Sequence, residues 1–334
     1  MPALAVAGAL RAEGAEVVFV GGERAEAELV PQAGYELRNI RVRGFDRTSP
    51  WRVAVPAALA ARATARAASI LRDERPGAVL GAGGYVAGPV GLAAVTLRRP
   101  LVLSEADSHL GLTNRMLAPL ARRVCLAFPI PGRDGPRYRV TGRPVPPPFT
   151  DRAAARARFE LAEEETCVLV FGGSLGARSI NQAAVAAFAG APFRVLHVAG
   201  QRDFATLASP GPGYDLREYL ELDEFEMALA ACDLVVARAG GSLFEVAAHG
   251  RPAVLIPYPH ASADHQASNA RWMAEAEAAV IVPDAELTPA RLAREVGELL
   301  GNPARLRAMS EASARLARPD AAREVARELL EAAG

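Results

Sequence analysis

Nine short apolar runs, separated by stretches rich in Ala, Leu and Arg, constrain the fold of this 334-residue chain more than any other feature. The runs occupy residues 15–22, 77–84, 100–106, 123–129, 166–173, 193–200, 233–240, 252–258 and 278–284. Continuous apolar strands that alternate with helices are typical of parallel sheets covered by helices on both faces. The pattern therefore predicts an α/β protein.

The segment 141–151, TGRPVPPPFTD, interrupts this alternation with four prolines. The formal charge changes sign nearby: residues 1–150 hold 20 Arg against 12 Asp or Glu (+8), and residues 151–334 hold 18 Arg against 26 (−8). A typical domain has about 150 residues, so the length also suggests two domains. We place them at 1–143 and 144–317.

Composition excludes several classes of protein. The formal net charge is zero, which argues against a nucleic-acid partner for the chain as a whole. Cys125, Cys167 and Cys232 are odd in number and far apart, which predicts neither a disulfide framework nor a zinc site and suits a reducing cytosol. No apolar run reaches the roughly 18 residues of a membrane-spanning helix, and the start lacks the basic region of a signal peptide.

A glycine-rich turn follows the apolar run at 166–173, in FGGSLGARSINQ. Glycines let the backbone approach a ligand, and a helix beginning near Leu175 would present unpaired N–H groups to a phosphate or sugar phosphate. In the alternative interpretation this is a tight turn in which Ser174 is the helix N-cap.

A second turn of this kind lies in RAGGSLFEVAAHG, residues 238–250. Ser242 and Glu245 have the spacing of a capping box, in which Glu245 would bond only to the backbone. In the alternative interpretation Glu245 accepts hydrogen bonds from a ribose diol, while the amides of residues 240–243 hold a diphosphate. Two such turns in one domain favour a bound nucleotide diphosphate.

A polar loop, PYPHASADHQASNA, covers residues 257–270, and we expect a helix to begin near Asp264. Ligands of α/β proteins lie outside the carboxyl ends of strands. Amide side chains suit sugar hydroxyl groups because they both donate and accept hydrogen bonds. His260 and His265 lack the spacing of zinc ligands, so no metal is expected.

Two motifs in the first half could face an acceptor. Residues 81–91, GAGGYVAGPVG, could wrap an anionic ligand in backbone N–H groups, or could mark a close contact between helix and sheet. Residues 104–115, SEADSHLGLTNR, place Glu105 and Asp107 at the end of another strand. Paired carboxylates alone are weak grounds for a catalytic role.

The stretch 38–66 holds seven Arg and one acidic residue. Apolar side chains at i, i+4 and i+8, ringed by arginines, suit contact with an anionic membrane surface. A half-buried helix with a basic solvent face is the alternative. The predicted membrane patch consists of Arg47, Trp51, Arg52, Val55 and Leu59.

Seven motifs, in this order, resemble the MurG family of GT-B glycosyltransferases: GAGGYVAGP, the E-x-D-x-x-x-G-L-T-N-R run, TGRPV, GGSLGARSINQ, RAGGSLFEVAAHGRPAVLIPYP, DHQ-x-x-NA and RPDAA. The resemblance covers nearly the whole chain. It implies two Rossmann-like domains facing across a cleft, with UDP-GlcNAc in the C-terminal domain and lipid I in the N-terminal domain. It also implies that a final helix at 318–334 packs back on the N-terminal domain.

The resemblance assigns donor contacts to the glycine-rich turns, the start of one helix and the polar loop: Gly173, Ser174, Leu222, Gly241, Ser242, Leu243, Glu245, His265 and Gln266. Glu245 would hold the ribose, Leu222 the uracil, and Gln266 with His265 the GlcNAc. On the acceptor side it implies Gly83, Gly84 and Tyr85.

The resemblance also implies the reaction, an inverting transfer of GlcNAc to the acceptor C4 hydroxyl at the cytoplasmic face of the cell membrane. Helix N-termini and arginines would neutralise the leaving UDP, without a cofactor. The chain departs from the family pattern at Asp107, where Asn is usual, and at Pro146, where Arg is frequent.

The family's opening strand and its Gly-Gly-Thr-Gly-Gly-His loop are absent, and no residue matches the loop histidine that serves as the candidate base. Asp107 and Glu105 remain the candidate catalytic residues. We expect this chain to bind UDP-GlcNAc with impaired transfer, and the gene product to begin upstream. The alternatives are an inactive sugar-nucleotide-binding protein and another GT-B enzyme with a lipid acceptor such as a diacylglycerol.

Overall fold

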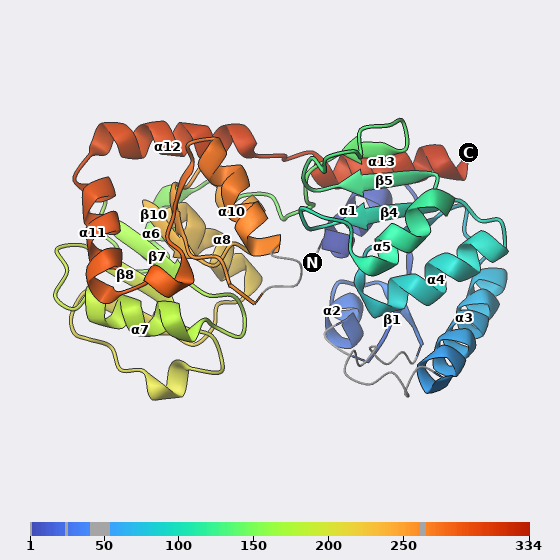
Figure 1. Ribbon diagram of the computed structural model, residues 1–334, viewed down its shortest axis with the longest axis horizontal. Coiled ribbons are helices and arrows are strands. Elements are labelled where there is room, and N and C mark those ends of the chain that lie inside the picture. The colour runs from blue at the N-terminus through green and yellow to red at the C-terminus, as the bar shows by residue number, and fades with distance from the viewer. Residues whose placement is uncertain (1, 24–25, 41–53, 261–264) are drawn as a thin grey trace. The chain divides into compact units, whose positions relative to one another are not determined.

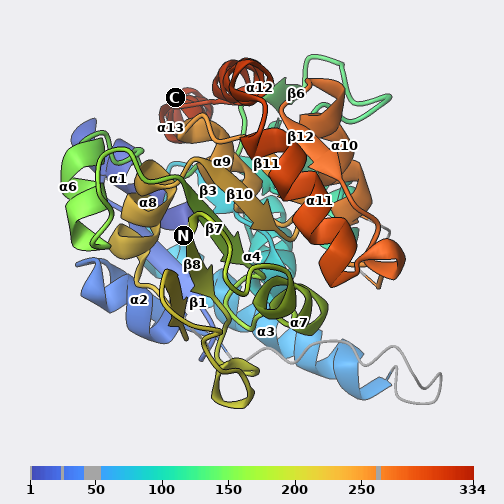
Figure 2. The same cartoon turned by 90° about the vertical axis from the view of Figure 1, so that its left-hand side faces the viewer.

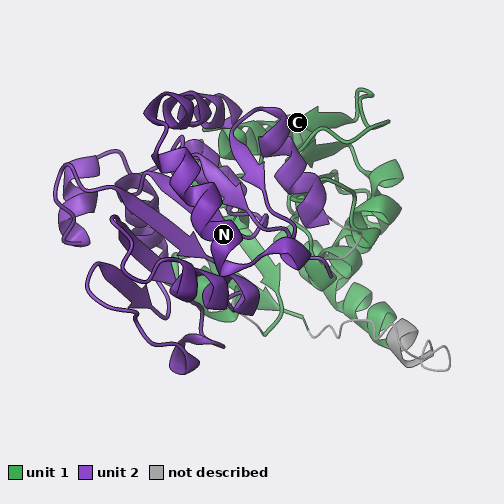
Figure 3. Ribbon diagram, turned by 60° about the vertical axis from the view of Figure 1, so that its left-hand side comes forward, with its two compact units in different colours: residues 1–145, 318–334 green, residues 146–317 purple. Residues whose placement is uncertain are grey.

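The computed structural model describes residues 2–23, 26–40, 54–260 and 265–334. The chain forms two compact units, which are coloured separately in Figure 3. Unit 1 comprises Met1–Val145 with Arg318–Gly334, and unit 2 comprises Pro146–Ala317. The α/β class expected from the alternating apolar runs is confirmed, and the sheets are parallel.

Unit 2 contains one six-stranded sheet in the order β12-β11-β10-β7-β8-β9, with every described pair parallel. Its strands are β7 (Cys167–Phe171), β8 (Arg194–Val198), β9 (Tyr214–Arg217), β10 (Leu234–Ala237), β11 (Ala253–Leu255) and β12 (Ala279–Ile281). β7 and β10 are buried along their whole length, as expected of strands covered on both faces.

Helices cover both faces of this sheet and enclose two apolar cores. α6 (Arg152–Arg158), α8 (Leu222–Ala231), α9 (Leu243–Ala248) and α10 (His265–Glu275) contribute to one core. α7 (Arg178–Ala187) and α11 (Pro289–Leu300) contribute to the other, and α12 (Pro303–Leu316) contributes to both. Figure 2 shows α6 and α8 on one side of the strands and α7 and α11 on the other.

Unit 1 contains two separate parallel sheets, β1-β2 and β3-β4-β5-β6. Their strands are β1 (Val18–Gly21), β2 (Glu36–Asn39), β3 (Val79–Gly81), β4 (Leu101–Glu105), β5 (Arg123–Leu126) and β6 (Tyr138–Val140). The helices are α1 (Pro2–Ala12), α2 (Glu26–Gln32), α3 (Ala54–Glu74), α4 (Gly84–Thr96), α5 (Leu112–Leu117) and α13 (Ala321–Ala333).

α13, at the far end of the chain, packs into unit 1 beside α1 (Figure 1). Val325 and Leu329 lie in one apolar cluster with Val6 of α1. On the same helix Glu328 forms an ion pair with Arg123, at 2.9 Å. A segment that lies 205 positions from Arg123 in sequence, at Glu328, thereby completes the core of unit 1.

Candidate functional site

The polar and glycine-rich segments of unit 2 gather at the carboxyl ends of three neighbouring strands. The chain winds from β7 to β9 in one direction across the sheet and from β10 to β12 in the other, so β7 and β10 flank the point where the winding reverses. Ligands of doubly wound sheets bind outside this point. The two glycine-rich turns follow β7 and β10, and the polar loop follows β11.

The turn after β7 (residues 172–177) requires glycine for a steric reason. Gly176 has a positive φ of 79°, and a Cβ there would lie 2.0 Å from the carbonyl oxygen of Ala199. The turn is closed by a hydrogen bond from the Gly176 N–H to the Gly173 carbonyl, at 2.9 Å. The helix begins at Arg178 with Ala177 as its N-cap, so both the expected start near Leu175 and the N-cap interpretation of Ser174 are wrong.

A buried polar network supports this turn from the neighbouring strand. The Asn181 amide donates to the Ala199 carbonyl at 2.9 Å, and its oxygen lies 3.0 Å from His197 Nε2. The Tyr214 hydroxyl contacts His197 Nδ1 at 2.8 Å. Burial lowers the pKa of His197 to about 4, so its imidazole is neutral and both ring nitrogens serve as hydrogen-bonding groups.

The turn after β10 leads directly into α9, which has Ser242 as its N-cap. Within the described residues Ser242 is the N-cap but makes no side-chain capping hydrogen bond, so the part of the capping box assigned to the Ser242 hydroxyl is wrong. Gly241, Leu243 and Glu245 lie in this turn and in the first turn of α9. The buried Asn269 of α10 donates to the Ala239 carbonyl at 3.2 Å and ties the turn to the next helix.

The polar loop after β11 reaches α10, whose described residues run from His265 to Glu275, and Asp264, near which the helix was expected to begin, lies outside the described residues. Gln266 accepts a hydrogen bond through Oε1 from the Tyr258 N–H at 3.0 Å, which orients its amide. Residues 261–264 lie outside the described part of the chain. Leu222, the predicted uracil contact, is the first residue of α8 and is half-buried.

An arginine that the sequence analysis did not single out lies between these segments. Arg238, the residue after β10, donates to Asp284 at 2.6 Å and to Ser179 at 2.7 Å. It also donates to the carbonyls of Ile256 and Pro257, at 3.1 and 3.3 Å. The signal in the sequence is a charged residue at the end of a fully apolar strand, directly before the glycine-rich turn.

A buried carboxyl group, that of Glu226 on α8, lies near His249, the C-cap of α9. Neither oxygen of Glu226 receives a hydrogen bond from the described residues, and His249 Nε2 lies 3.6 Å away. The same Nε2 accepts a hydrogen bond from the Phe149 N–H at 3.1 Å. Burial, with the nearby Glu245 and Asp223 as smaller causes, raises the pKa of Glu226 from 4.5 to about 8, so its neutral form is favoured at neutral pH.

In unit 1 the candidate catalytic residue Glu105 holds its own loop together. Its carboxylate accepts hydrogen bonds from the Gly111 N–H at 2.8 Å, the Asn114 amide at 2.9 Å and the Asp107 N–H at 3.2 Å. These bonds occupy both oxygens of a side chain that is 6% exposed. Glu105 therefore fixes the loop that carries Asp107.

The predicted acceptor residues lie at the same edge of this sheet, after β3. Gly83 is the N-cap of α4, and Gly84 is its first residue, with φ values of 88° and 74°. Tyr85 is 54% exposed. A cavity of about 220 Å³ lies beside this turn, with Glu105 and Arg143 among its lining residues.

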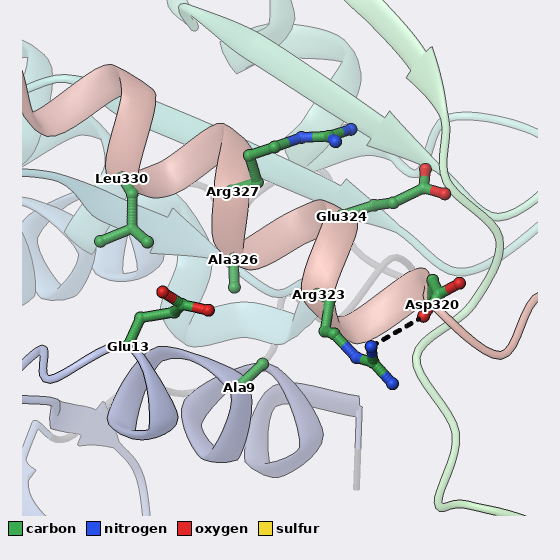
Figure 4. A pocket seen from close by; sticks show the side chains of 8 residues that line it. All are labelled: Ala9, Glu13, Asp320, Arg323, Glu324, Ala326, Arg327 and Leu330. Carbon is green, nitrogen blue, oxygen red and sulfur yellow. Dashed lines mark ion pairs between the residues drawn. The ribbon is translucent and has the colours of Figure 1, made fainter.

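A groove of about 540 Å³ lies between α1 and α13, away from the predicted site residues (Figure 4). Its lining carries both signs of charge and consists of Ala9, Glu13, Asp320, Arg323, Glu324, Ala326, Arg327 and Leu330. Arg323 and Asp320 form an ion pair at 3.4 Å. Because its lining is neither mainly positive nor mainly negative, the groove does not favour an anionic or a cationic ligand.

Most of the predicted membrane patch lies outside the described residues. Arg47, Trp51 and Arg52 lie outside the described residues, as does the side chain of Val55. Leu59 lies on α3 and is 37% exposed. No helix among the described residues is long and apolar enough to cross a membrane, and the same residues contain no group of three or more potential metal ligands.

Comparison with known proteins shows that the chain is a glycosyltransferase of the GT-B class. Residues 1–126 match the N-terminal domain of glycosyltransferase family 28, and residues 167–325 match its C-terminal domain. The chain aligns with the crystal structure of Acinetobacter baumannii MurG at a TM-score of 0.77 and 28% identity, covering 99% of this chain and 95% of that one. The fold is thus the GT-B fold of glycosyltransferases.

Sequence relatives narrow the class to one family. The chain is 42% identical to the UDP-N-acetylglucosamine--N-acetylmuramyl-(pentapeptide) pyrophosphoryl-undecaprenol N-acetylglucosamine transferase of Moorella thermoacetica, over 96% of this chain and 92% of that protein. It is 42% identical to the transferase of the same name from Rubrobacter xylanophilus, over 98% of both. The chain belongs to this family of N-acetylglucosamine transferases, the MurG family.

Proposed function

We propose that the chain transfers GlcNAc from UDP-GlcNAc to the C4 hydroxyl of the MurNAc in undecaprenyl-pyrophosphoryl-MurNAc-pentapeptide, converting lipid I to lipid II in peptidoglycan synthesis. The observation that carries the proposal is the pair of glycine-rich turns after β7 and β10, on the two sides of the winding reversal in unit 2. Family membership supports the same reaction.

In this proposal unit 2 binds the donor and unit 1 the acceptor. The amides at the start of α9, from Gly241 to Leu243, hold the diphosphate, because helix N-termini favour negative charge. Glu245 accepts hydrogen bonds from the ribose, and backbone near Leu222 contacts the uracil. The sugar and diphosphate also meet Gly173 and Ser174, whereas Gln266, with His265 near, contacts the GlcNAc.

On the acceptor side, Gly83, Gly84 and Tyr85 line the approach of lipid I. The acceptor hydroxyl oxygen attacks the anomeric carbon, the bond to the UDP oxygen breaks, and the configuration inverts. Asp107 is the residue of this edge that we nominate to take the hydroxyl proton, because its neighbour Glu105 is engaged with the loop backbone. General-base assistance contributes roughly 10²–10⁴-fold.

We also propose a peripheral position on the anionic cytoplasmic face of the membrane. Besides the patch from Arg47 to Leu59, α5 and the turn after it expose apolar side chains at helical spacing. Leu112, Met116 and Leu120 are 55%, 69% and 55% exposed, and Arg115 lies among them. Apolar side chains beside arginine suit the headgroup boundary of a membrane.

The test is release of UDP from UDP-GlcNAc in the presence of a lipid I analogue, measured for the wild type and for Glu245→Ala. Loss of two hydrogen bonds to a charged acceptor predicts a KM for UDP-GlcNAc higher by about 10–100-fold. Glu298→Gln, on α11, is the control and leaves KM unchanged. A wild type that releases no UDP in the presence of acceptor contradicts the proposal.

A further inference from the structure

Arg238 is a buried cation whose contacts reach three separate segments of unit 2. It is 8% exposed and makes an ion pair with Asp284 at 2.6 Å. Ser179 completes a triangle, because its hydroxyl accepts from Arg238 and donates to the same Asp284 oxygen, both at 2.7 Å. A planar guanidinium with several fixed donors can make these bonds at once, whereas an ammonium cannot hold the same geometry.

Two of the segments that Arg238 contacts, and the turn that Arg238 itself precedes, lie beside predicted donor contacts. Ser179 lies in the first turn of α7, directly after the turn that contains Ser174. Pro257, whose carbonyl Arg238 contacts at 3.3 Å, precedes Tyr258, and the Tyr258 N–H holds the side chain of Gln266. Arg238 itself is two residues before the glycines that lead into α9.

We propose that Arg238 is a positioning residue that fixes the spacing of three donor-binding segments, the turn after β7, the turn after β10 and the loop after β11. This inference rests on the proposed function, because the three segments matter together only if one ligand spans them. Arg238 affects the ligand indirectly, by holding these segments in place. Its guanidinium donates hydrogen bonds to Asp284, to Ser179 and to two backbone carbonyls.

A matched control separates positioning from ordinary structural stabilisation. Arg156 of α6 is similarly buried, at 4% exposure, and likewise donates to backbone carbonyls, including that of Ala231 at 2.9 Å. Ala231 lies before β10, at the amino end of the strand, whereas Arg238 follows its carboxyl end. Arg238→Lys and Arg156→Lys therefore make the same chemical change at opposite ends of one strand.

The experiment measures UDP binding by calorimetry, the kinetics of transfer and amide hydrogen exchange on the full chain. We expect Arg238→Lys to weaken UDP binding by about 10–100-fold, because small displacements of positioning groups have effects of that size. KM for UDP-GlcNAc should rise more than kcat falls. Exchange should accelerate together at Gly176, Leu243 and Tyr258, while Arg156→Lys leaves UDP affinity unchanged.

Equal UDP affinity in Arg238→Lys and the wild type overturns the inference, as does an equal loss in Arg156→Lys. If Arg238→Lys does not fold, Ser179→Ala is measured instead, because it removes an uncharged hydrogen-bond partner of Arg238. Weaker UDP binding by Ser179→Ala supports the inference, and unchanged binding overturns it. A wild type that binds no UDP refutes the proposed function instead, and the exchange at the three segments then tests the role of Arg238 alone.

Discussion

The two units are both built on parallel sheets covered by helices, but they differ in how continuous their sequences are. Unit 2 uses one contiguous stretch, 146–317, and its six strands form a single sheet in which the strands at the winding reversal, β7 and β10, pair directly. Unit 1 divides its strands between two sheets and takes its last helix, α13, from the end of the chain. The predicted donor site is thus built within one continuous segment, whereas the core of unit 1 depends on residues distant in sequence.

The largest expected effect concerns the close backbone contact between Gly176 and Ala199 in unit 2. Gly176→Ala introduces a Cβ 2.0 Å from the Ala199 carbonyl at a positive φ. Strain and overpacking together should reduce the free energy of unfolding of unit 2 by about 3 kcal/mol or more and abolish UDP binding. Chemical denaturation and calorimetry with UDP measure the two effects.

Gly190→Ala is the matched control for this prediction. Gly190 also has a positive φ, 68°, but a Cβ there meets no atom within 4 Å. Only the conformational strain of about 1–2 kcal/mol applies, and UDP binding should persist. Equal effects of the two substitutions would show that contact between the two backbone segments does not shape the donor site.

The second largest expected effect concerns the contribution of α13 to the stability of unit 1. Leu329→Ala removes a side chain that is 5% exposed from the cluster shared with Val6. The loss of buried surface and the resulting cavity should cost unit 1 about 2–5 kcal/mol. Hydrogen exchange should accelerate in β4 and α1, while the affinity for UDP stays at the wild-type value. A change in UDP affinity would contradict the independence of the donor site.

A smaller effect concerns the pH dependence of unit 2. Burial raises the pKa of Glu226 to about 8, so the folded state retains a proton that the unfolded state releases above its ordinary value of 4.5. The protonated Glu226 side chain therefore contributes to the free energy of unfolding. This contribution is fully present below pH 4.5 and is lost as the pH rises through 8. Glu226→Gln removes the titration.

Denaturation at pH 5 and at pH 9 measures the effect of this substitution. The stability of Glu226→Gln relative to the wild type should increase by about 2–4 kcal/mol between the two values. His249, Glu245 and Asp223 are the other titratable groups near this carboxyl, and all three remain in the variant. A difference that stays constant with pH would show that Glu226 is not buried in an uncharged form.

The smallest expected effect concerns the surface of unit 1. Replacing both Met116 and Leu120 by Ser should weaken binding to vesicles that contain phosphatidylglycerol by about 3–10-fold, because two partly inserted side chains are lost. Leu29→Ser on α2, a residue that is 38% exposed, is the control. Vesicle sedimentation measures the binding, and identical sedimentation of all three proteins would contradict a membrane role for this surface.

The sequence predicted the interior of the fold better than its edges. All nine strands expected from apolar runs are present, and the central strands of unit 2, such as β7 and β10, are apolar along their length because both of their faces are buried. β2, β6 and β9 were missed. Each ends a sheet and carries charged or polar residues, as in ELRN, YRV and YDLR, so no continuous apolar run marks it.

The predicted donor residues gather at neighbouring strand ends because a parallel sheet brings successive carboxyl ends to one edge. Glycine-rich turns after apolar strands were therefore sufficient to locate this edge. Pattern alone could not reveal the contacts of Arg238 with Asp284 or of Glu226 with His249. These partners are 46 and 23 positions apart in the chain and meet only after the sheet has formed.

Calorimetric titration of the full chain with UDP-GlcNAc measures whether unit 2 binds the donor. We expect saturable binding at one site, weakened by Glu245→Ala and retained in Leu329→Ala under conditions where that variant is folded. Folded wild-type protein that takes up no UDP-GlcNAc, or binding that is indifferent to the loss of the Glu245 carboxylate, would contradict this expectation.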